Sequence, residues 1–324
     1  FWLRRSVVHV DQLNQQIYFT ALKRSSIERH LYKINFNGNG LKRISKRKGV
    51  HKISFSPNGK YYFDKYSNIS EMPSLTIHDK NGNRIHILNE PSMDIINNKN
   101  IKMPELFTIP TSDGFQMPAQ ILKPINFDPN KRYPIIFHIY GGPSAPTVFN
   151  QWQGSSLYYD NILLNKGFLI LRFDHRSASA ISKTLENRLT MMMSGPRELS
   201  DISDGIEWLK SQPYIDSTRL GIWGWSGGGS FTLNAMTNTK YFKAGISGAP
   251  VTDWHYYDTK WAEFAMKKPQ DNSKGYEQTS FVKSAKNLHG KLLLIHGTYD
   301  DNVHPQNSWN FIDELINENI MFDM

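Results

Sequence analysis

The chain has 324 residues, of which 39% are hydrophobic and 21% are charged, as in an ordinary globular protein. It contains no cysteine, which excludes disulfides, thiolate metal sites and a cysteine nucleophile, and it has no run of 18 apolar residues that would span a membrane. The net charge of +9 comes from the first 60 residues, where 13 Lys and Arg outnumber 2 Asp and Glu but lie mostly at predicted turns, which argues against a nucleic-acid partner.

Residues 1–95 alternate short strand-like runs with turn signals and show no helical period. Four pairs of runs are each joined by a turn, and Asn-Gly in three of these turns is a strong hairpin signal. The paired runs are Val7–Val10 with Ile17–Phe19, His30–Ile34 with Leu41–Ile44, Lys52–Phe55 with Tyr61–Phe63, and Leu75–His78 with Arg84–Leu88. Four evenly spaced hairpins predict about two four-stranded blades of a β-propeller, with a small all-β sandwich as the alternative. Because two blades cannot close a ring, we expect the chain to begin inside a longer propeller.

From residue 96 to 324 the pattern is that of a second, α/β domain. Phe107–Ile109 and Gln120–Leu122 flank a turn and predict an entry hairpin. Buried-type strands are then predicted at Ile135–Tyr140, Leu169–Phe173, Leu220–Trp223, Ala244–Ser247 and Leu292–His296, with a last one beginning at Ile320. Apolar residues at helical spacing predict helices around Leu199–Leu209, Phe231–Met236 and Trp309–Ile316. Strands that alternate with helices predict a doubly wound, mostly parallel sheet.

The segment Gly221–Gly229 has the pattern of a nucleophile elbow, with G-x-S-x-G formed by Gly224, Ser226 and Gly228. An apolar strand precedes it and a helix-compatible run follows it. The glycines suit a turn so sharp that neighbouring Cβ atoms would collide, and such a turn pushes the serine hydroxyl above the sheet edge. The alternative is a glycine-rich loop that merely ends a strand. The context predicts a catalytic serine in an α/β-hydrolase fold.

A serine nucleophile needs a base to take its proton and an acid to orient the base, and in this fold the acid follows the serine. The strand that ends at His296 leads into a loop with two neighbouring carboxylates, Asp300 and Asp301. The carboxyl end of a later strand is where the acid is expected. Spacing does not choose between the two aspartates, and both could simply cap the loop.

Several separated motifs closely resemble the prolyl oligopeptidase family, in particular its dipeptidyl peptidase IV branch. They are Tyr140–Pro143, Gly224–Gly229, Ala249–Asp258 and His296–His304. The resemblance covers essentially the whole chain and implies the end of a propeller followed by most of an α/β-hydrolase domain. It implies a serine peptidase that cleaves short peptides, of the dipeptidyl or prolyl type, without metal or cofactor. A homodimer and a periplasmic or secreted location are also implied by the resemblance alone.

Position by position, the resemblance makes Ser226 the nucleophile and Asp300 the acid. It assigns the oxyanion hole to the Tyr140 hydroxyl and the Gly227 backbone N–H. The pocket for the residue before the scissile bond matches Val251, Trp254, Tyr257, Trp261, Asn302 and Val303. Four features depart from the branch and bear on the expected proline preference. Gly227 and Trp261 stand where it commonly has tyrosine, Phe264 stands near an expected arginine, and the segment Asp174–Ser177 lacks the usual Arg-Gly turn.

A general base is not evident in the chain. The catalytic histidine of the family follows the strand after the acid, which begins here at Ile320, and no histidine follows His304. We therefore expect the base beyond Met324 and little activity from these 324 residues alone, with His296 and His304 as the alternatives within the chain. An esterase of the same fold and a catalytically inactive binding protein are the other functional classes consistent with the sequence.

Overall fold

The computed structural model describes residues 4–324 and divides into two compact units. The first contains the chain up to Leu106 together with Val148–Asn161 and Ile181–Lys183, and the second contains Phe107–Thr147, Ile162–Ala180 and Thr184–Met324. The domain boundary expected between residues 95 and 96 falls within the short helix α1 (Asp94–Asn98) and stays a prediction.

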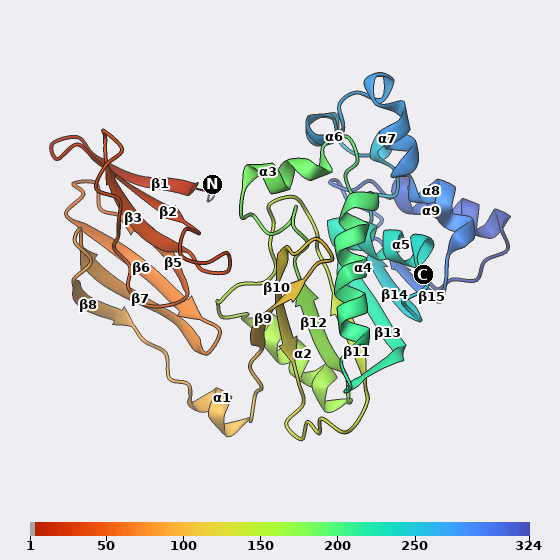
Figure 1. Ribbon diagram of the computed structural model, residues 1–324, viewed down its shortest axis with the longest axis horizontal. Helices are drawn as coiled ribbons and strands as arrows, with labels where there is room; N and C mark the ends of the chain where they lie inside the picture. Colours follow the sequence, from red (N-terminus) through yellow and green to blue (C-terminus); the bar gives the residue numbers. More distant parts are fainter. Residues whose placement is uncertain (1–3) are drawn as a thin grey trace. The chain divides into compact units, whose positions relative to one another are not determined.

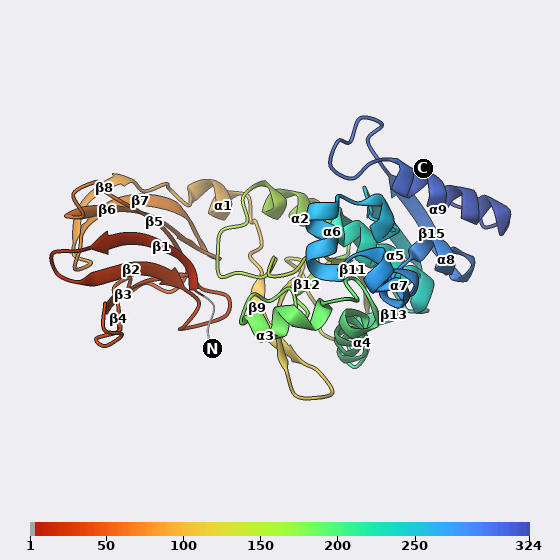
Figure 2. The ribbon, with the colours of Figure 1, turned by 90° about the horizontal axis from the view of Figure 1, so that it is seen from above.

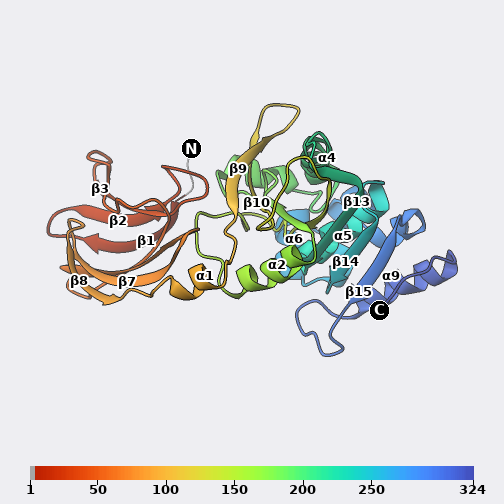
Figure 3. The same cartoon turned by 90° about the horizontal axis from the view of Figure 1, so that it is seen from below.

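The first unit is built on two four-stranded sheets whose strands follow one another in sequence order. The pairs with defined register are antiparallel, as expected for hairpins. One sheet contains β1 (Arg4–Asp11), β2 (Gln16–Ala21), β3 (His30–Asn35) and β4 (Lys42–Arg43), and the other contains β5 (Val50–Phe55), β6 (Tyr61–Asn68), β7 (Glu71–Asp79) and β8 (Arg84–Asn89). Figures 2 and 3 show the sheets stacked face to face. The predicted pair of propeller blades is confirmed.

Turn chemistry and a shared core explain this arrangement. Gly38, Gly59 and Gly82 lie in the predicted Asn-Gly turns with φ of 85°, 66° and 93°, a region that glycine enters without steric cost. Between the sheets, the side chains of Tyr18, Leu31, Ile44 and Tyr62 form one buried cluster. Each sheet thus has an inner apolar face that the other covers.

The second unit is organised by a seven-stranded sheet in the order β15-β14-β13-β11-β12-β10-β9. Strands β11 to β15 pair in parallel and β10 pairs antiparallel with β12. The strands are β9 (Glu105–Pro110), β10 (Gln116–Leu122), β11 (Tyr133–His138), β12 (Leu169–Phe173), β13 (Ile215–Trp225), β14 (Ala244–Gly248) and β15 (Lys291–Ile295). Asp323 forms a parallel bridge with Leu293 on the free side of β15, where the strand expected from Ile320 would lie. The sheet is the doubly wound α/β-hydrolase sheet that the sequence predicted.

The long helices of this unit have apolar faces that pack on the sheet. In α4, the predicted residues Ile202, Ile206 and Leu209 are buried in one cluster with sheet residues and with Phe231 of α5. Figure 1 shows α4 lying over the strands. The α-helices after α1 are α2 (Ser155–Asn165), α3 (Lys183–Glu186), α4 (Pro196–Lys210), α5 (Gly227–Asn238), α6 (Thr259–Met266), α7 (Ser273–Gln278), α8 (Phe281–Ser284) and α9 (Gln306–Asn317), and the short 3₁₀ helices are η1 (Asn187–Leu189), η2 (Trp254–Tyr256), η3 (Pro269–Asp271) and η4 (Ala285–Asn287).

The segment Val148–Asn161 belongs to the first unit, although it lies between β11 and β12 in the sequence. Asn150 holds it there, because its backbone N–H donates to the Ile27 carbonyl at 2.9 Å and its side-chain Oδ1 accepts from the Ile69 N–H at 3.1 Å. Its Nδ2 donates to Glu28 at 3.1 Å. None of the helices within residues 4–324 has the length and apolar character needed to cross a membrane.

Candidate active site

Ser226 lies at a sharp turn between β13 and α5, which is the strand–turn–helix context predicted for a nucleophile. Its φ of 56° and ψ of −120° lie in a sparsely populated region of backbone conformation. A non-glycine residue in such a conformation carries about 1–3 kcal/mol of backbone strain. The Ser226 N–H donates to the Gly248 carbonyl of β14 at 2.8 Å, and its carbonyl accepts from the Ser230 N–H at 3.0 Å. These bonds from the sheet and the helix hold the strained backbone in place.

The glycines around Ser226 are required by close backbone contacts. A Cβ at Gly224 or Gly228 would collide with the Ile139 carbonyl oxygen, and a Cβ at Gly229 would collide with the Gly248 carbonyl oxygen. Gly227 differs, because a Cβ there would lie 3.3 Å from the Tyr140 carbonyl oxygen and meet nothing closer. Glycine is therefore needed sterically at three of the four positions, and at position 227 a side chain is nearly accommodated.

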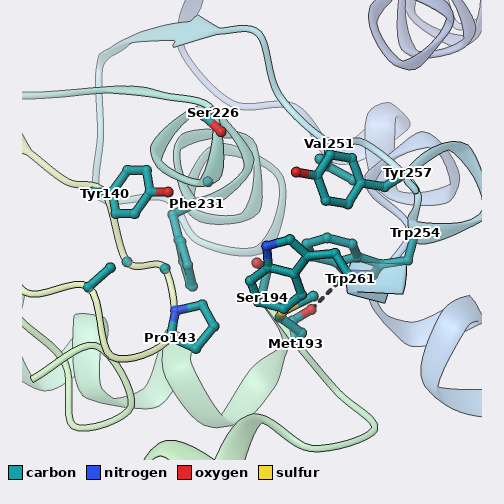
Figure 4. Close-up of a pocket in the computed structure, with 14 residues that line it drawn as sticks. Tyr140, Pro143, Met193, Ser194, Ser226, Phe231, Val251, Trp254, Tyr257 and Trp261 are labelled. Atoms are coloured by element: carbon teal, nitrogen blue, oxygen red, sulfur yellow. Dashed lines mark hydrogen bonds between the residues drawn. The ribbon is translucent and has the colours of Figure 1, made fainter. Parts of the chain in front are cut away.

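A pocket whose empty space, counted together with its opening to solvent, is about 530 Å³ lies beside Ser226. In Figure 4 the hydroxyl groups of Ser226, Tyr140 and Tyr257 face the same space. The cavity is lined by Tyr140, Gly141, Gly142, Pro143, Ala145, Met193, Ser194, Ser226, Gly227, Phe231, Val251, Trp254, Tyr257 and Trp261. Ser226, Tyr140, Gly227 and four of the six predicted pocket residues are thus brought together.

The backbone after Tyr140 turns through Gly141, whose φ is 74°. His175 is buried beneath this turn, and its Nε2 donates to the Gly141 carbonyl at 3.0 Å. Burial lowers the pKa of His175 to about 4, so the ring is neutral at physiological pH and its Nε2 carries the hydrogen. His175 therefore supports the turn that presents Tyr140, a role that nothing in the sequence motifs indicated.

The apolar side of the cavity is formed mainly by η2 and α6. The Trp254 indole N–H donates to the Met193 carbonyl at 2.9 Å, and the Tyr257 hydroxyl donates to Asn302 Oδ1 at 3.0 Å. Burial raises the pKa of the Tyr257 hydroxyl, so this group stays a hydrogen-bond donor. Asn302 and Val303 do not line the cavity. Asn302 is hydrogen-bonded to the cavity residue Tyr257, and Val303 packs in the same buried cluster as the cavity residue Val251.

Asp300 and Asp301 follow β15 and have different environments. Asp300 Oδ1 accepts from the backbone N–H groups of Asn302 at 3.0 Å and of Val303 at 2.9 Å, which fixes the orientation of its carboxylate. Asp301 is exposed. The loop therefore holds Asp300 in a defined direction, as an acid that orients a base must be held.

The two histidines of this loop are engaged elsewhere. His296 is nearly buried; its Nδ1 lies 2.6 Å from the Ser308 hydroxyl and its Nε2 lies 2.7 Å from the Val303 carbonyl oxygen. Asp300 Oδ2 is farther from that Nε2, at 3.6 Å, so the carbonyl is the partner that fixes the ring. His304 accepts from the Gln306 N–H at 3.2 Å. Both rings have local structural partners, which argues against a role as base.

Seven cavity residues were given no role from the sequence: Gly141, Gly142, Pro143, Ala145, Met193, Ser194 and Phe231. Pro143 belongs to the motif Tyr140–Pro143, in which only Tyr140 has a predicted role. Met193 and Ser194 come from a loop before α4, far from every motif, and no local signal identifies them. Phe231 was read only as part of a helix.

Comparison with known proteins fits this geometry. The sequence model of the prolyl oligopeptidase family matches residues 156–324. The chain belongs to the prolyl oligopeptidase family. Residues 2–73 match the N-terminal region of dipeptidyl peptidase IV, so both units agree with the dipeptidyl peptidase IV type of family member.

Individual relatives support the same assignment. The crystal structure of Porphyromonas gingivalis dipeptidyl peptidase 4 superposes with a TM-score of 0.93 and 30% identity over 100% of this chain and 46% of that one. A crystal structure of a protein from Bacteroides ovatus gives a TM-score of 0.90 at 30% identity over 99% of this chain and 46% of that one. A probable dipeptidyl-aminopeptidase B of Arthroderma otae is 33% identical over 94% of this chain and 34% of its own length. The chain thus spans about a third of the length of the curated relatives it matches.

Proposed function

We propose that the protein is a serine peptidase that releases dipeptides from the amino ends of short peptides through an acyl-enzyme. The observation that carries this proposal is Ser226, which is held in a strained elbow beside an apolar cavity that also receives the Tyr140 hydroxyl. The dipeptidyl part of the proposal comes from the names of the Porphyromonas and Arthroderma relatives.

The proposed reaction begins when Ser226 Oγ attacks the scissile carbonyl carbon and its proton passes to the base. The Tyr140 hydroxyl and the Gly227 N–H donate to the oxyanion that develops, and each such donor lowers the barrier by about 3–4 kcal/mol. The tetrahedral intermediate expels the amine, which takes the proton from the base and leaves the acyl group on Ser226. Water then repeats the sequence and releases the dipeptide.

In this proposal Asp300 orients the base, and the base is a histidine outside the 324 residues. Three facts support it: the loop fixes the Asp300 carboxylate, His296 and His304 have structural partners, and the matched relatives are about three times as long as the matched region. The 324-residue chain by itself should then show only the residual catalysis of an enzyme that lacks one triad member.

The cavity is proposed to bind the residue before the scissile bond. Val251, Trp254 and Trp261 give it apolar surfaces that suit proline or another compact apolar side chain. Gly227 leaves one side open where the dipeptidyl peptidase IV branch commonly has tyrosine, so we expect a broader preference than for proline alone.

The test uses the full-length protein with a dipeptide p-nitroanilide and a p-nitrophenyl ester. Ser226→Ala should reduce kcat on the anilide by about 10⁴-fold or more. Ser211→Ala changes an exposed serine at the end of α4 and should leave the rate unchanged. Ester turnover without anilide turnover would identify an esterase instead. Absence of any turnover would favour a catalytically inactive binding protein, and cleavage of a substrate with an acetylated amino end would exclude the dipeptidyl mode.

A further inference from the structure

Glu198 lies in the first turn of α4 and is almost completely buried. Its Oε2 accepts from the Gly195 N–H at 3.0 Å, and its Oε1 accepts from the Ser194 N–H at 3.3 Å. A buried carboxyl is costly unless its oxygens are hydrogen-bonded, and here both are. The residue at the helix cap is Gly195, which has no side chain, so the carboxyl of Glu198 takes over the pairing of these backbone groups.

The backbone that Glu198 holds is the loop Met193–Gly195, which we call the pocket-wall loop. Ser194 has a φ of 57°, so the loop bends sharply at a non-glycine residue. Two carbonyl groups at this bend accept hydrogen bonds from side chains. The Met193 carbonyl accepts from the Trp254 indole N–H at 2.9 Å, and the Ser194 carbonyl accepts from Asn234 Nδ2 at 2.7 Å.

These contacts join Glu198 to the candidate active site. Met193 and Ser194 line the cavity, as Figure 4 shows, and Trp254 forms its apolar side. Asn234 belongs to α5, the helix that begins at Gly227 beside Ser226. The position of the pocket-wall loop therefore fixes the position of Trp254, and Glu198 fixes the loop at its bend.

We propose that Glu198 is a positioning residue that sets the width of the pocket for the residue before the scissile bond. This inference rests on the proposed peptidase function and deepens it. Glu198 acts through the Ser194 and Gly195 N–H groups and does not touch the substrate. It should therefore govern the KM of substrates that fill the pocket and leave kcat largely unchanged, because the Ser226 elbow is held by other bonds.

The ionisation of Glu198 offers an internal probe of this role. Burial is the main reason why the pKa of the Glu198 carboxyl is raised to about 8. The hydrogen bonds from the Gly195 and Ser194 N–H groups lower this pKa, whereas the negative charge of the nearby Asp201 raises it. Asp201 is paired with Arg176, which also pairs with Asp113. Asn234 of α5 and Thr279, which lie against the loop, are uncharged. The carboxylate accepts both N–H bonds at full strength, whereas the protonated acid accepts one of them less well.

The principal experiment compares Glu198→Gln with wild type in the full-length protein at pH 9, where the Glu198 carboxyl of wild type is ionised. The substrates are two dipeptide p-nitroanilides that differ only in proline or glycine before the scissile bond. For the proline substrate we expect KM to rise about five- to tenfold with kcat within about twofold. For the glycine substrate, which leaves the pocket empty, both constants should stay within about twofold. Glu207→Gln removes an exposed carboxylate from the same helix and should change neither.

A loss of kcat that is equal for both substrates would show a purely structural role, and unchanged constants would show no role; either result overturns the proposal. The two proposals fail differently. Absence of any turnover that depends on Ser226 removes the peptidase function, whereas normal turnover without a substrate-dependent change in KM removes only the role of Glu198.

A second measurement needs no variant and applies even if Glu198→Gln does not fold. The ratio of kcat/KM for the proline and glycine substrates cancels every titration that the two reactions share. In wild type we expect this ratio to rise about threefold or more between pH 7 and pH 9, as the carboxylate forms and the loop is held more firmly. A ratio that stays constant across this range overturns the proposal.

Discussion

The Tyr140 hydroxyl is the catalytic group whose role is easiest to isolate by substitution. Tyr140→Phe removes one hydrogen-bond donor and almost no volume. If this hydroxyl stabilises the oxyanion, kcat of the full-length protein should fall about 10²–10³-fold with little change in KM. Tyr159→Phe, at an exposed tyrosine of α2, is the matched control. A kcat for Tyr140→Phe within about threefold of wild type would remove Tyr140 from the oxyanion hole.

The buried carboxyl of Glu198 also predicts how the free energy of unfolding depends on pH. Its pKa of about 8 in the folded protein lies above the ordinary value of 4.5, so the folded state binds this proton more tightly than the unfolded state does. The stabilisation of the folded state by this bound proton is fully present below pH 4.5 and is lost progressively as the pH rises to about 8. Glu198→Gln should remove this loss, which is on the order of a few kcal/mol.

The measurement is urea unfolding of both proteins between pH 5 and pH 9, followed by a probe in the second unit. Wild type should lose stability with pH more steeply than Glu198→Gln. Glu207→Gln should keep the wild-type slope, since its carboxylate is exposed and has a lowered pKa from its hydrogen bond with Lys210. Parallel curves for wild type and Glu198→Gln would contradict the expected titration.

The elbow shows how glycine requirements differ within one element. Gly228→Ala would place a methyl group against the Ile139 carbonyl oxygen, and relief requires movement of β11 or α5. We expect a loss of about 3 kcal/mol or more in unfolding free energy, or failure to fold. Gly227→Ala adds its methyl group where the nearest atom is 3.3 Å away and gains helix propensity, so its stability should stay within about 1 kcal/mol of wild type. Equal stabilities of the two variants, measured by urea unfolding, would refute this account of the turn.

The sheet could be predicted almost strand by strand, because its central strands are buried on both faces and appear as continuous apolar runs. Strand β12 is the clearest case, since its predicted and observed limits, Leu169–Phe173, coincide. Helix α4 was predicted because one apolar face repeats at helical spacing. Helices α1 to α3 and α6 to α8 were not predicted. They are short or carry apolar residues around much of their surface, so no single period marks them.

The site was predictable only where its residues lie within motifs. Ser226 follows from the local strand–turn–helix pattern, whereas Tyr140 and Gly227 were assigned through the family resemblance, and the cavity contains all three. His175, Met193 and Glu198 act by supporting the backbone of other segments. Their contacts arise from tertiary packing between distant parts of the chain, and a single sequence carries no sign of them.

At the scale of the whole molecule, the segment Val148–Asn161 belongs to the first unit, although β11 and β12 on either side of it in the sequence belong to the second. Asn150→Ala would leave the Ile69 N–H and Glu28 without this partner, at a cost of about 1–3 kcal/mol to the local structure. We expect faster amide hydrogen exchange in residues 148–161 and unchanged exchange in β13. Asn130→Ala, in an exposed turn, is the control. Unchanged exchange in residues 148–161 would show that Asn150 does not hold the segment.

The same segment has a consequence for how the protein is made. Translation delivers β1–β8 to the tunnel exit before Val148–Asn161, and the segment separates two strands, β11 and β12, that pair directly in the sheet. The pairing of β11 with β12 therefore closes a connection whose middle part belongs to the first unit, which is synthesised earlier. We expect ribosome-bound chains that are stalled once Val148–Asn161 has left the exit tunnel to bury Trp152 already, as tryptophan quenching would show.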